Sequence, residues 1–235
     1  MMRVLFVSNG HGEEAISARI AAALAQIVPV RSDHLALVGA FGHPSVMHDV
    51  GPRRAMPSGG LIAMGNVRNI ARDIGAGLIG HTLAQLRFLR SVRGSYDAVV
   101  AVGDVFALLM ALQARAKTVY LGTAKSVHVA PYGPLEERVL RRANVVLTRD
   151  PATAQRLRER GVPAQAPGNV IADLDSGEDG AAMDRTAAGF SPAIGLFPGS
   201  RPGSAYSDAV ALCGVVGAIA AQLPAVGGLL SIAPG

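Results

Sequence analysis

Short apolar runs alternate along the chain with longer stretches in which apolar residues recur at helical spacing. An apolar run bounded by turn residues predicts a strand, and the helical spacing predicts a helix. Strands that alternate with helices form βαβ units, which build a parallel sheet covered by helices. We therefore expect an α/β protein. Its predicted strands are Arg3–Val7, His34–Val38, Ala98–Val102, Thr118–Leu121, Val145–Thr148, Ala193–Phe197 and Gly228–Ile232.

The helical periodicity is clear after the first strand, where apolar residues from Ile16 to Ile27 share one face of a helix expected at Glu13–Ile27. A long helix is expected at Asn66–Ser91. Its segment GAGLIG, Gly75–Gly80, has a low helix propensity, which predicts a kink or a close packing contact. The other predicted helices are Phe106–Ala114, Leu135–Arg142, Ala152–Arg160 and Ser207–Gln222.

The alternation is interrupted once, by the acidic, small and polar segment Ala172–Arg185, which is typical of a linker. The sequence therefore predicts a Rossmann-like domain over residues 1–171 and a linker over residues 172–189. Residues 190–235 read as only the first βαβ unit of a second Rossmann-like domain. No internal repeat is evident.

The uncharged segment Ala209–Gly235 is long enough to span a bilayer. Gln222 and Pro224 divide it into shorter pieces, so we predict a buried helix followed by a strand instead. The apolar run at the N-terminus is short and predicts a first strand rather than a signal peptide. A single cysteine, Cys213, excludes a disulfide framework and fits a reducing cytoplasm.

The net charge of +5 is distributed unevenly. Residues 1–170 hold 20 Lys and Arg against 11 Asp and Glu, and the remaining residues hold 2 against 6. The basic part suits phosphates or an anionic membrane surface, although ordinary helix-surface arginines give the same count. Aromatic residues make up 4% of the chain and no nucleic-acid-binding motif is present, so nucleic acid is not an expected partner.

The first candidate site is the segment SNGHGEE, Ser8–Glu14, which follows the first predicted strand. Ligands of open parallel sheets bind beyond the carboxyl ends of the strands. Gly10 and Gly12 would let the backbone turn and approach a ligand, and the amides at the start of the next helix favour an anion. His11 suits a general base at neutral pH, or it merely caps the turn. Glu13 and Glu14 also suit a helix N-terminus electrostatically.

The second candidate is Asp104, which follows a strongly apolar strand and Gly103 and precedes a helix. A helix N-cap is a common role for aspartate. The alternative is functional, because Asp104 is expected at the same sheet edge as His11. There it would orient the histidine, stabilise its charge or bind a hydroxyl.

The third candidate is LFPGSRPGS, Leu196–Ser204, in which a strand leads through a glycine turn to Ser200, Arg201 and a helix. Backbone amides in such a turn cradle phosphates, and an arginine pairs with a diphosphate bidentately. A plain strand-to-helix turn has the same pattern.

Five segments in this order and spacing resemble lipid-A-disaccharide synthase and especially its uncharacterised relatives. They are SNGHGEE, PSGGL (Pro57–Leu61), TRDPATAQRLRERGV (Thr148–Val162), GNVIAD (Gly168–Asp173) and LFPGSRPGSAY (Leu196–Tyr206). The resemblance implies a glycosyltransferase of the GT-B architecture, with an N-terminal acceptor domain and a C-terminal domain for a UDP-sugar donor. It implies transfer of a sugar to an acceptor hydroxyl, most simply on a lipid-linked acceptor, as in lipid A biosynthesis.

By this resemblance His11 is the base that removes the acceptor proton, with Asp104 as its catalytic partner. The donor diphosphate would meet Gly199, Ser200 and Arg201. The expected substrate-binding residues are Ser8, Asn9, Gly10, Gly12, Glu13 and Asn169. No metal and no cofactor other than the UDP-sugar substrate are expected. The expected location is cytoplasmic, on the inner face of a membrane, with the arginines of the long helix (Arg68, Arg72, Arg87, Arg90 and Arg93) on anionic lipid.

Two departures from the family pattern shape the expectations. The synthases have a small-residue first loop without this histidine, so the acceptor need not be a lipid A precursor. The chain also stops where most of a C-terminal domain would follow, which predicts that it is inactive alone. The alternatives are a UDP-sugar 2-epimerase-like enzyme, which shares the two-domain architecture, and a non-catalytic module that binds a phospho-sugar or a partner chain.

Overall fold

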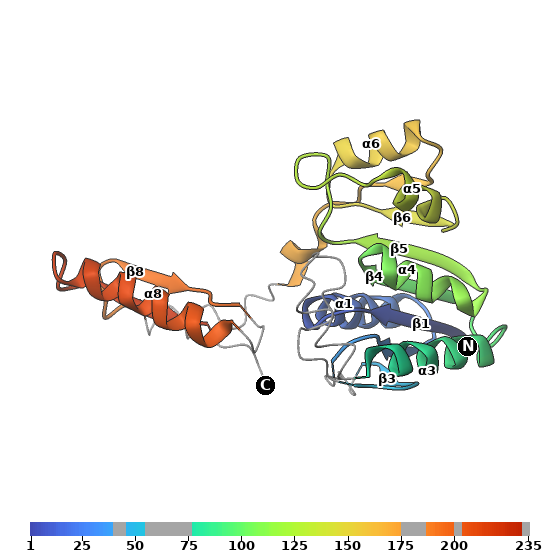
Figure 1. Cartoon of the computed structure of the whole chain (residues 1–235), viewed down its shortest axis with the longest axis horizontal. Helices are drawn as coiled ribbons and strands as arrows, with labels where there is room; N and C mark the ends of the chain where they lie inside the picture. Colours follow the sequence, from blue (N-terminus) through green and yellow to red (C-terminus); the bar gives the residue numbers. More distant parts are fainter. Residues whose placement is uncertain (40–45, 55–76, 175–186, 200–203, 232–235) are drawn as a thin grey trace. The chain divides into compact units, whose positions relative to one another are not determined.

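A computed structural model describes residues 1–39, 46–54, 77–174, 187–199 and 204–231 (Figure 1). The chain divides into two compact units, Met1–Leu174 and Asp175–Gly235. The predicted α/β class is confirmed. The first unit ends three residues after the predicted domain boundary at residue 171, because a short 3₁₀ helix, η3 (Val170–Leu174), packs against the first helix.

The first unit is built on a parallel sheet of seven strands in the order β3-β2-β1-β4-β5-β6-β7. From β1 the chain builds outward to β3 and then crosses back to the other side of β1, where β4 pairs with it. This order is Rossmann-like, with the topological switch point between β1 and β4. The strands are β1 (Met2–Ser8), β2 (Val30–Ala36), β3 (His48–Asp49), β4 (Ala98–Gly103), β5 (Lys117–Gly122), β6 (Val145–Leu147) and β7 (Ala164–Gln165).

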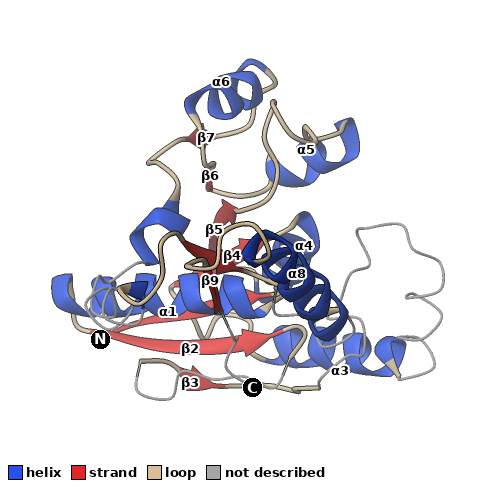
Figure 2. Cartoon of the chain, turned by 90° about the vertical axis from the view of Figure 1, so that its left-hand side faces the viewer, coloured by secondary structure: helices blue, strands red, loops and turns tan. Residues whose placement is uncertain are grey.

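Helices cover both faces of this sheet, and Figure 2 shows them as blue ribbons beside the red strands. Helix α1 packs against one face, where Ala18 and Ala21 contact Val4 and Phe6 of β1. Helices α3, α4, α5 and α6 contribute to the apolar cluster on the other face. Their bounds are α1 (His11–Ile27), α3 (Leu78–Ser91), α4 (Val105–Ala111) with its 3₁₀ extension η2 (Leu112–Ala114), α5 (Pro134–Leu140) and α6 (Pro151–Glu159).

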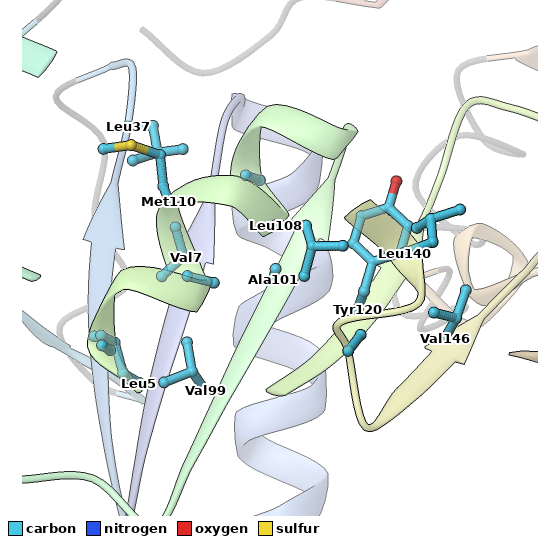
Figure 3. Packing of buried hydrophobic residues seen from close by; sticks show 14 of the residues in the cluster. Leu5, Val7, Leu37, Val99, Ala101, Leu108, Met110, Tyr120, Leu140 and Val146 are labelled. Carbon is cyan, nitrogen blue, oxygen red and sulfur yellow. The ribbon is translucent and has the colours of Figure 1, made fainter. Parts of the chain in front are cut away.

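The larger cluster forms because strand residues alternate between the two faces. Val7 and Ala101 point to the same face, where Leu108 and Met110 of α4 lie over the sheet (Figure 3). Farther along the same cluster, Leu140 of α5 packs with the strand residues. Full burial of a leucine side chain is worth about 2–3 kcal/mol. The cluster therefore holds the central strands, and with them the carboxyl edge, in place.

Strand β2 begins at Val30, four residues before the predicted start at His34. This first half of the strand was not predicted, because the residues Arg31-Ser32-Asp33 are polar. They nevertheless pair in register with β1. Asp33 is 1% exposed and accepts hydrogen bonds from Arg3, Arg31 and Tyr96. Hydrogen bonds to other residues, rather than an apolar sequence, therefore allow Asp33 to be buried in this strand.

Two edge strands, β3 and β7, were not predicted, because two residues leave no apolar run to detect. The C-terminal part of the predicted long helix is confirmed as α3. It begins after Gly77, which has a left-handed backbone with φ of +89°. The predicted N-terminal part, residues 66–76, lies outside the described residues, as does the segment Pro57–Leu61.

The segment TRDPATAQRLRERGV has a clear local role at the start of α6. Asp150 is the N-cap and accepts hydrogen bonds from the Thr153 amide at 2.7 Å and the Thr153 hydroxyl at 2.8 Å. Pro151 occupies the first turn, where its missing N–H costs nothing. The Thr153 oxygen in turn accepts from the Val127 amide, which fixes the loop after β5.

The second unit contains one βαβ unit, as predicted. Strand β8 (Ala193–Leu196) pairs in parallel with β9 (Gly227–Leu230), and α8 (Ala205–Ala220) packs on both strands. The prediction that this helix is buried is wrong: no residue of α8 is buried, because a sheet of two strands covers little of its surface. Its outer surface carries the exposed apolar side chains Tyr206, Val210 and Val215.

Candidate functional site

The candidate site is the carboxyl edge of the sheet at the switch point, where β1 and β4 end side by side. Ser8, the last residue of β1, pairs with Val102 of β4, one residue before the end of that strand. His11 is the first residue of α1, and Asp104 directly precedes α4. The sheet therefore brings the first two predicted segments to neighbouring strand ends, which is the position that binds ligands in this fold.

Glu13 connects these two strand ends. A Cβ atom on Gly10 would lie 2.5 Å from Glu13 Oε2, and one on Gly103 would lie 3.1 Å from Glu13 Cγ. Gly103 also has φ of +123°, a backbone that side chains rarely adopt. Both glycines thus make room for the Glu13 side chain, which lies between the end of β1 and the end of β4. Gly10 has an extended φ of −174°, so space rather than backbone freedom explains it.

His11 and Gly12 occupy the first turn of α1. His11 is half-buried, and its Nδ1 atom is shielded from solvent. Gly12 is exposed, and a Cβ atom there would meet nothing within 4 Å. A small residue is therefore not required at Gly12 by the protein itself. Asn9, between Ser8 and the N-cap residue Gly10, completes the loop.

Asp104 is the N-cap of α4. Its Oδ1 atom accepts a hydrogen bond from the Ala107 amide at 3.0 Å. The prediction that Asp104 caps a helix is thus confirmed, and such a cap stabilises the folded protein by about 1 kcal/mol. Capping uses one carboxylate oxygen and holds the group at the switch point, so a role toward a ligand stays a prediction.

A buried polar cluster lies beneath the first loop. The Ser8 hydroxyl lies 2.8 Å from His34 Nε2, and Arg53 Nη2 lies 3.2 Å from His34 Nδ1. A guanidinium only donates, so Nδ1 accepts and Nε2 carries the hydrogen that is donated to Ser8. The Glu14 carboxylate, 2% exposed, approaches Nδ1 at 3.8 Å, and Asp49 approaches it at 3.7 Å.

This cluster clarifies the roles of Ser8 and Glu14. Ser8 is 1% exposed and is engaged with His34, so it supports the loop from within. Glu14 faces the cluster, whereas Glu13 faces the end of β4. Sequence reasoning missed His34, Asp49 and Arg53. The one signal for His34 was a histidine at the start of the apolar run HLALV.

Two tyrosines support the edge on the β5 side. The Tyr120 hydroxyl donates to the Gly103 carbonyl at 2.8 Å and lies 3.4 Å from the Tyr132 hydroxyl. Burial raises the pKa of Tyr120 well above its usual value, and Tyr132 raises it further. Burial likewise raises the pKa of Tyr132. Both hydroxyls therefore stay protonated, and Tyr120 fixes the backbone directly before Asp104.

Asn169 also approaches this edge. Its side-chain Oδ1 accepts from the Ile171 amide at 3.4 Å and its carbonyl accepts from the Ala172 amide at 3.0 Å, which starts η3. The neighbouring Val170 packs with Ile16 of α1 and with Val102 and Leu121, near the ends of β4 and β5. The segment GNVIAD therefore returns the chain to the same edge as the first two candidate segments.

The third candidate segment is described only in part. Gly199 has a left-handed backbone with φ of +86°, and a Cβ atom there would meet nothing within 4 Å. Glycine is thus required by backbone conformation, in agreement with the predicted turn. Ser200 and Arg201 lie outside the described residues, so their proposed diphosphate contacts stay predictions.

The comparisons with known proteins leave the family open. No family model matches the chain, and no curated protein matches it. Among the described residues, no cluster of three or more His, Cys, Asp or Glu side chains is placed to hold a metal ion. Within the same residues, none of the helices has the length and apolar character needed to cross a membrane.

Proposed function

We propose that the protein is a glycosyltransferase similar to lipid-A-disaccharide synthase, which moves a sugar from a UDP-sugar to an acceptor hydroxyl. The observation that carries the proposal is the arrangement at the switch point. A histidine, two carboxylates and an asparagine-led turn come from segments far apart in sequence and gather where β1 and β4 end. This composition suits proton transfer to and from a hydroxyl group.

His11 is the proposed general base. The acceptor oxygen attacks the anomeric carbon of the donor sugar, its proton passes to the His11 imidazole, and the bond from the anomeric carbon to the diphosphate breaks. UDP leaves with the bonding electrons. Glu13 and Asp104 supply negative charge near the imidazolium that forms, which favours it electrostatically. Gly103 lets the Glu13 side chain lie against the end of β4.

The donor diphosphate is assigned to the turn Gly199–Arg201 of the second unit. The left-handed backbone of Gly199 suits a glycine turn. Backbone amides of such a turn would bind the phosphates, and Arg201 would neutralise the leaving diphosphate. Arg185 and Arg201 are the only basic residues of the chain after residue 171. Arg185→Ala is therefore a matched control for Arg201→Ala in calorimetric titrations with UDP and UDP-N-acetylglucosamine. We expect UDP to bind more weakly to Arg201→Ala and with wild-type affinity to Arg185→Ala.

The test of the reaction is UDP release from UDP-N-acetylglucosamine, with and without a lipid extract as a source of acceptors. Transfer predicts UDP release that depends on the extract. We expect His11→Ala to lower the rate by a factor of about 10²–10⁴, as for loss of a general base, with UDP affinity unchanged. His48→Ala, which changes an exposed histidine on the edge strand β3, is the control.

Three outcomes contradict the proposal. UDP and free sugar released without any acceptor indicate an epimerase-like enzyme. If the chain binds UDP but releases no UDP from the UDP-sugar with any fraction of the extract, it is a non-catalytic module. Full activity in His11→Ala removes the histidine from the mechanism.

A further inference from the structure

The buried polar cluster beneath the first loop has a titratable ring at its centre. His34 is fully buried in β2, opposite Phe6 of β1. Histidine is the side chain whose charge changes most readily near neutral pH. Asp33, its neighbour on β2, points to the opposite face of the sheet, where it binds Tyr96. Among the described residues, the polar groups that face the ring are Ser8 of β1, Glu14 of α1, Asp49 of β3 and Arg53 after β3.

A neutral His34 ring uses both of its nitrogens in the arrangement that the structure shows. Nε2–H donates to the Ser8 hydroxyl, and Nδ1 accepts from Arg53 Nη2. The same Nη2 group also donates to Asp49, and its two hydrogens suffice for both bonds. One guanidinium nitrogen therefore holds the neutral ring and Asp49 together.

A protonated ring is incompatible with this arrangement. Both ring nitrogens then donate, so Nδ1 no longer accepts from Arg53. Carboxylate oxygens of Asp49 and Glu14 lie 3.7 Å and 3.8 Å from Nδ1. These two carboxylates and the guanidinium sum to a net charge of −1, which a proton on the ring brings to zero. The cluster therefore favours uptake of a proton.

Glu14 is the better of the two new partners for the protonated ring. Its side chain is 2% exposed, whereas that of Asp49 is 33% exposed and already accepts from Arg53. Charges interact more strongly where water is excluded. A charge-assisted hydrogen bond has an N–O distance of about 2.8 Å, so the Glu14 carboxylate has to approach by about 1 Å. Glu14 lies one turn after His11 on the same side of α1.

We propose that His34 is a positioning residue for the loop Ser8–Glu14. Protonation of the ring transfers Nδ1 from Arg53 to Glu14 and draws the first turn of α1 toward β2. That turn therefore takes two positions, selected by one proton on a fully buried ring.

The inference concerns the position of the loop and requires neither a UDP-sugar nor a reaction. It can therefore fail while the proposed function holds, and the reverse. Only its consequence for transfer rests on the proposed function, because a displacement of about 1 Å in a catalytic group can change a rate by about 100-fold.

The experiment is a nuclear magnetic resonance titration of the isotopically labelled full chain between about pH 5 and pH 9. The ring shifts of His34 give the midpoint of its protonation. The N–H residual dipolar couplings of Gly12 and Glu13 give the movement of the first turn, because they report orientation rather than charge. We expect these couplings to change with the His34 midpoint, relative to the couplings of β1, which should stay constant.

Two carboxylate variants separate the movement from the charge. Glu14→Gln and Asp49→Asn each remove one negative charge, so both should shift the His34 midpoint to lower pH. Only Glu14→Gln should lose most of the change in the couplings. His128→Asn, which changes an exposed histidine after β5, is the control and should alter neither quantity. Circular dichroism of each variant excludes unfolding as the cause.

Three results overturn the proposal. The first is a His34 ring that keeps one protonation state throughout the titration. The second is a change in the couplings that persists in full in Glu14→Gln. The third is a change that disappears in His11→Asn, which would assign it to titration of His11 itself.

Discussion

The two units use the same βαβ pattern with very different results. In the first unit α4 buries Ala107, Leu108, Met110 and Ala111 against a sheet of seven strands. In the second unit the longer α8 is made mostly of apolar and small residues, yet it buries none of them against two strands. An apolar sequence therefore selects the face that a helix turns to a sheet, but the width of the sheet decides how much surface leaves water.

This difference indicates that the first unit has the greater folding stability. Hydrophobic burial is the dominant favourable contribution to folding, and it is concentrated between Met1 and Leu174. We expect amide exchange to be slow in the central strands of the first unit and fast throughout α8 and β9. The following substitutions test that contrast, in order of decreasing effect.

The largest effect is expected for Leu108→Ala, because Leu108 is fully buried in the cluster of the first unit. Removing its side chain should lower the free energy of unfolding of the first unit by about 2–5 kcal/mol. Urea unfolding followed by far-UV circular dichroism measures the change. Leu109→Ala on the same helix is the control, since that side chain is 38% exposed. A loss as large for Leu109→Ala would show that burial is not the cause.

The next effect concerns Asp33, the buried carboxylate of β2. Burial raises the pKa of Asp33, but hydrogen bonds from Tyr96, Arg31 and Arg3 outweigh this and leave it below 3.8. Because the folded-state pKa is lowered, the stabilisation is present above pH 3.8 and is lost as the pH falls below that value. Asp33→Asn should cost about 2 kcal/mol at pH 7 and flatten the acid dependence of unfolding.

The matched control for this change is Asp208→Asn, in the first turn of α8. Its exposed carboxylate should leave the unfolding of the first unit unchanged at pH 7 and at pH 3. Equal acid sensitivity in wild type and in Asp33→Asn would contradict the assignment of this dependence to β2.

Two substitutions at Asp104 distinguish its structural role as the cap of α4 from its proposed role in the reaction. Asp104→Ala removes the cap of α4 and should cost about 1 kcal/mol, whereas Asp104→Asn keeps an accepting oxygen and should cost only a few tenths. If the carboxylate also serves the reaction, both variants lose UDP release equally. If it serves only as a cap, Asp104→Asn keeps wild-type activity. Thermal unfolding and the UDP-release assay are measured on the same samples.

The smallest effect is expected for Val210→Ser on α8. The side chain is 56% exposed, so the change in free energy of unfolding should be below about 0.5 kcal/mol. Hydrogen exchange of α8, with and without the substitution, provides the measurement. A loss above about 1 kcal/mol would mean that this face of α8 is covered in solution, and the contrast between the units would then disappear.

Among the residues that the structure describes, apolar patterning predicted the α/β class, the helices α1, α3, α4, α5 and α6 and the strands β1, β4, β5 and β6. The residue types of Val4, Phe6 and Leu108 indicate buried positions, which is why the pattern was informative. It failed at Arg31–Asp33, where three polar residues form part of β2. The burial of Asp33 depends on Arg3 and Tyr96, which lie far away in sequence and leave no local signal. Patterning also missed β3 and β7, which are too short to show a period.

The site was predictable in position but not in contacts. The loop Ser8–Glu14 and Asp104 follow strands, and parallel topology alone brings such residues to one edge. The direction of each carboxylate was not predictable. The Glu13 side chain lies between Gly10 and Gly103 and the Glu14 carboxylate faces His34, although the two residues are adjacent in sequence and chemically equal.

The short helix η3 has a consequence for the loop that carries His11. Val170 packs with Ile16 of α1 and near the ends of β4 and β5. The last turn of the first unit therefore supports the first turns of α1 from a position distant in sequence. The loop Ser8–Glu14 thus has its place fixed only once the far end of the unit has folded against it.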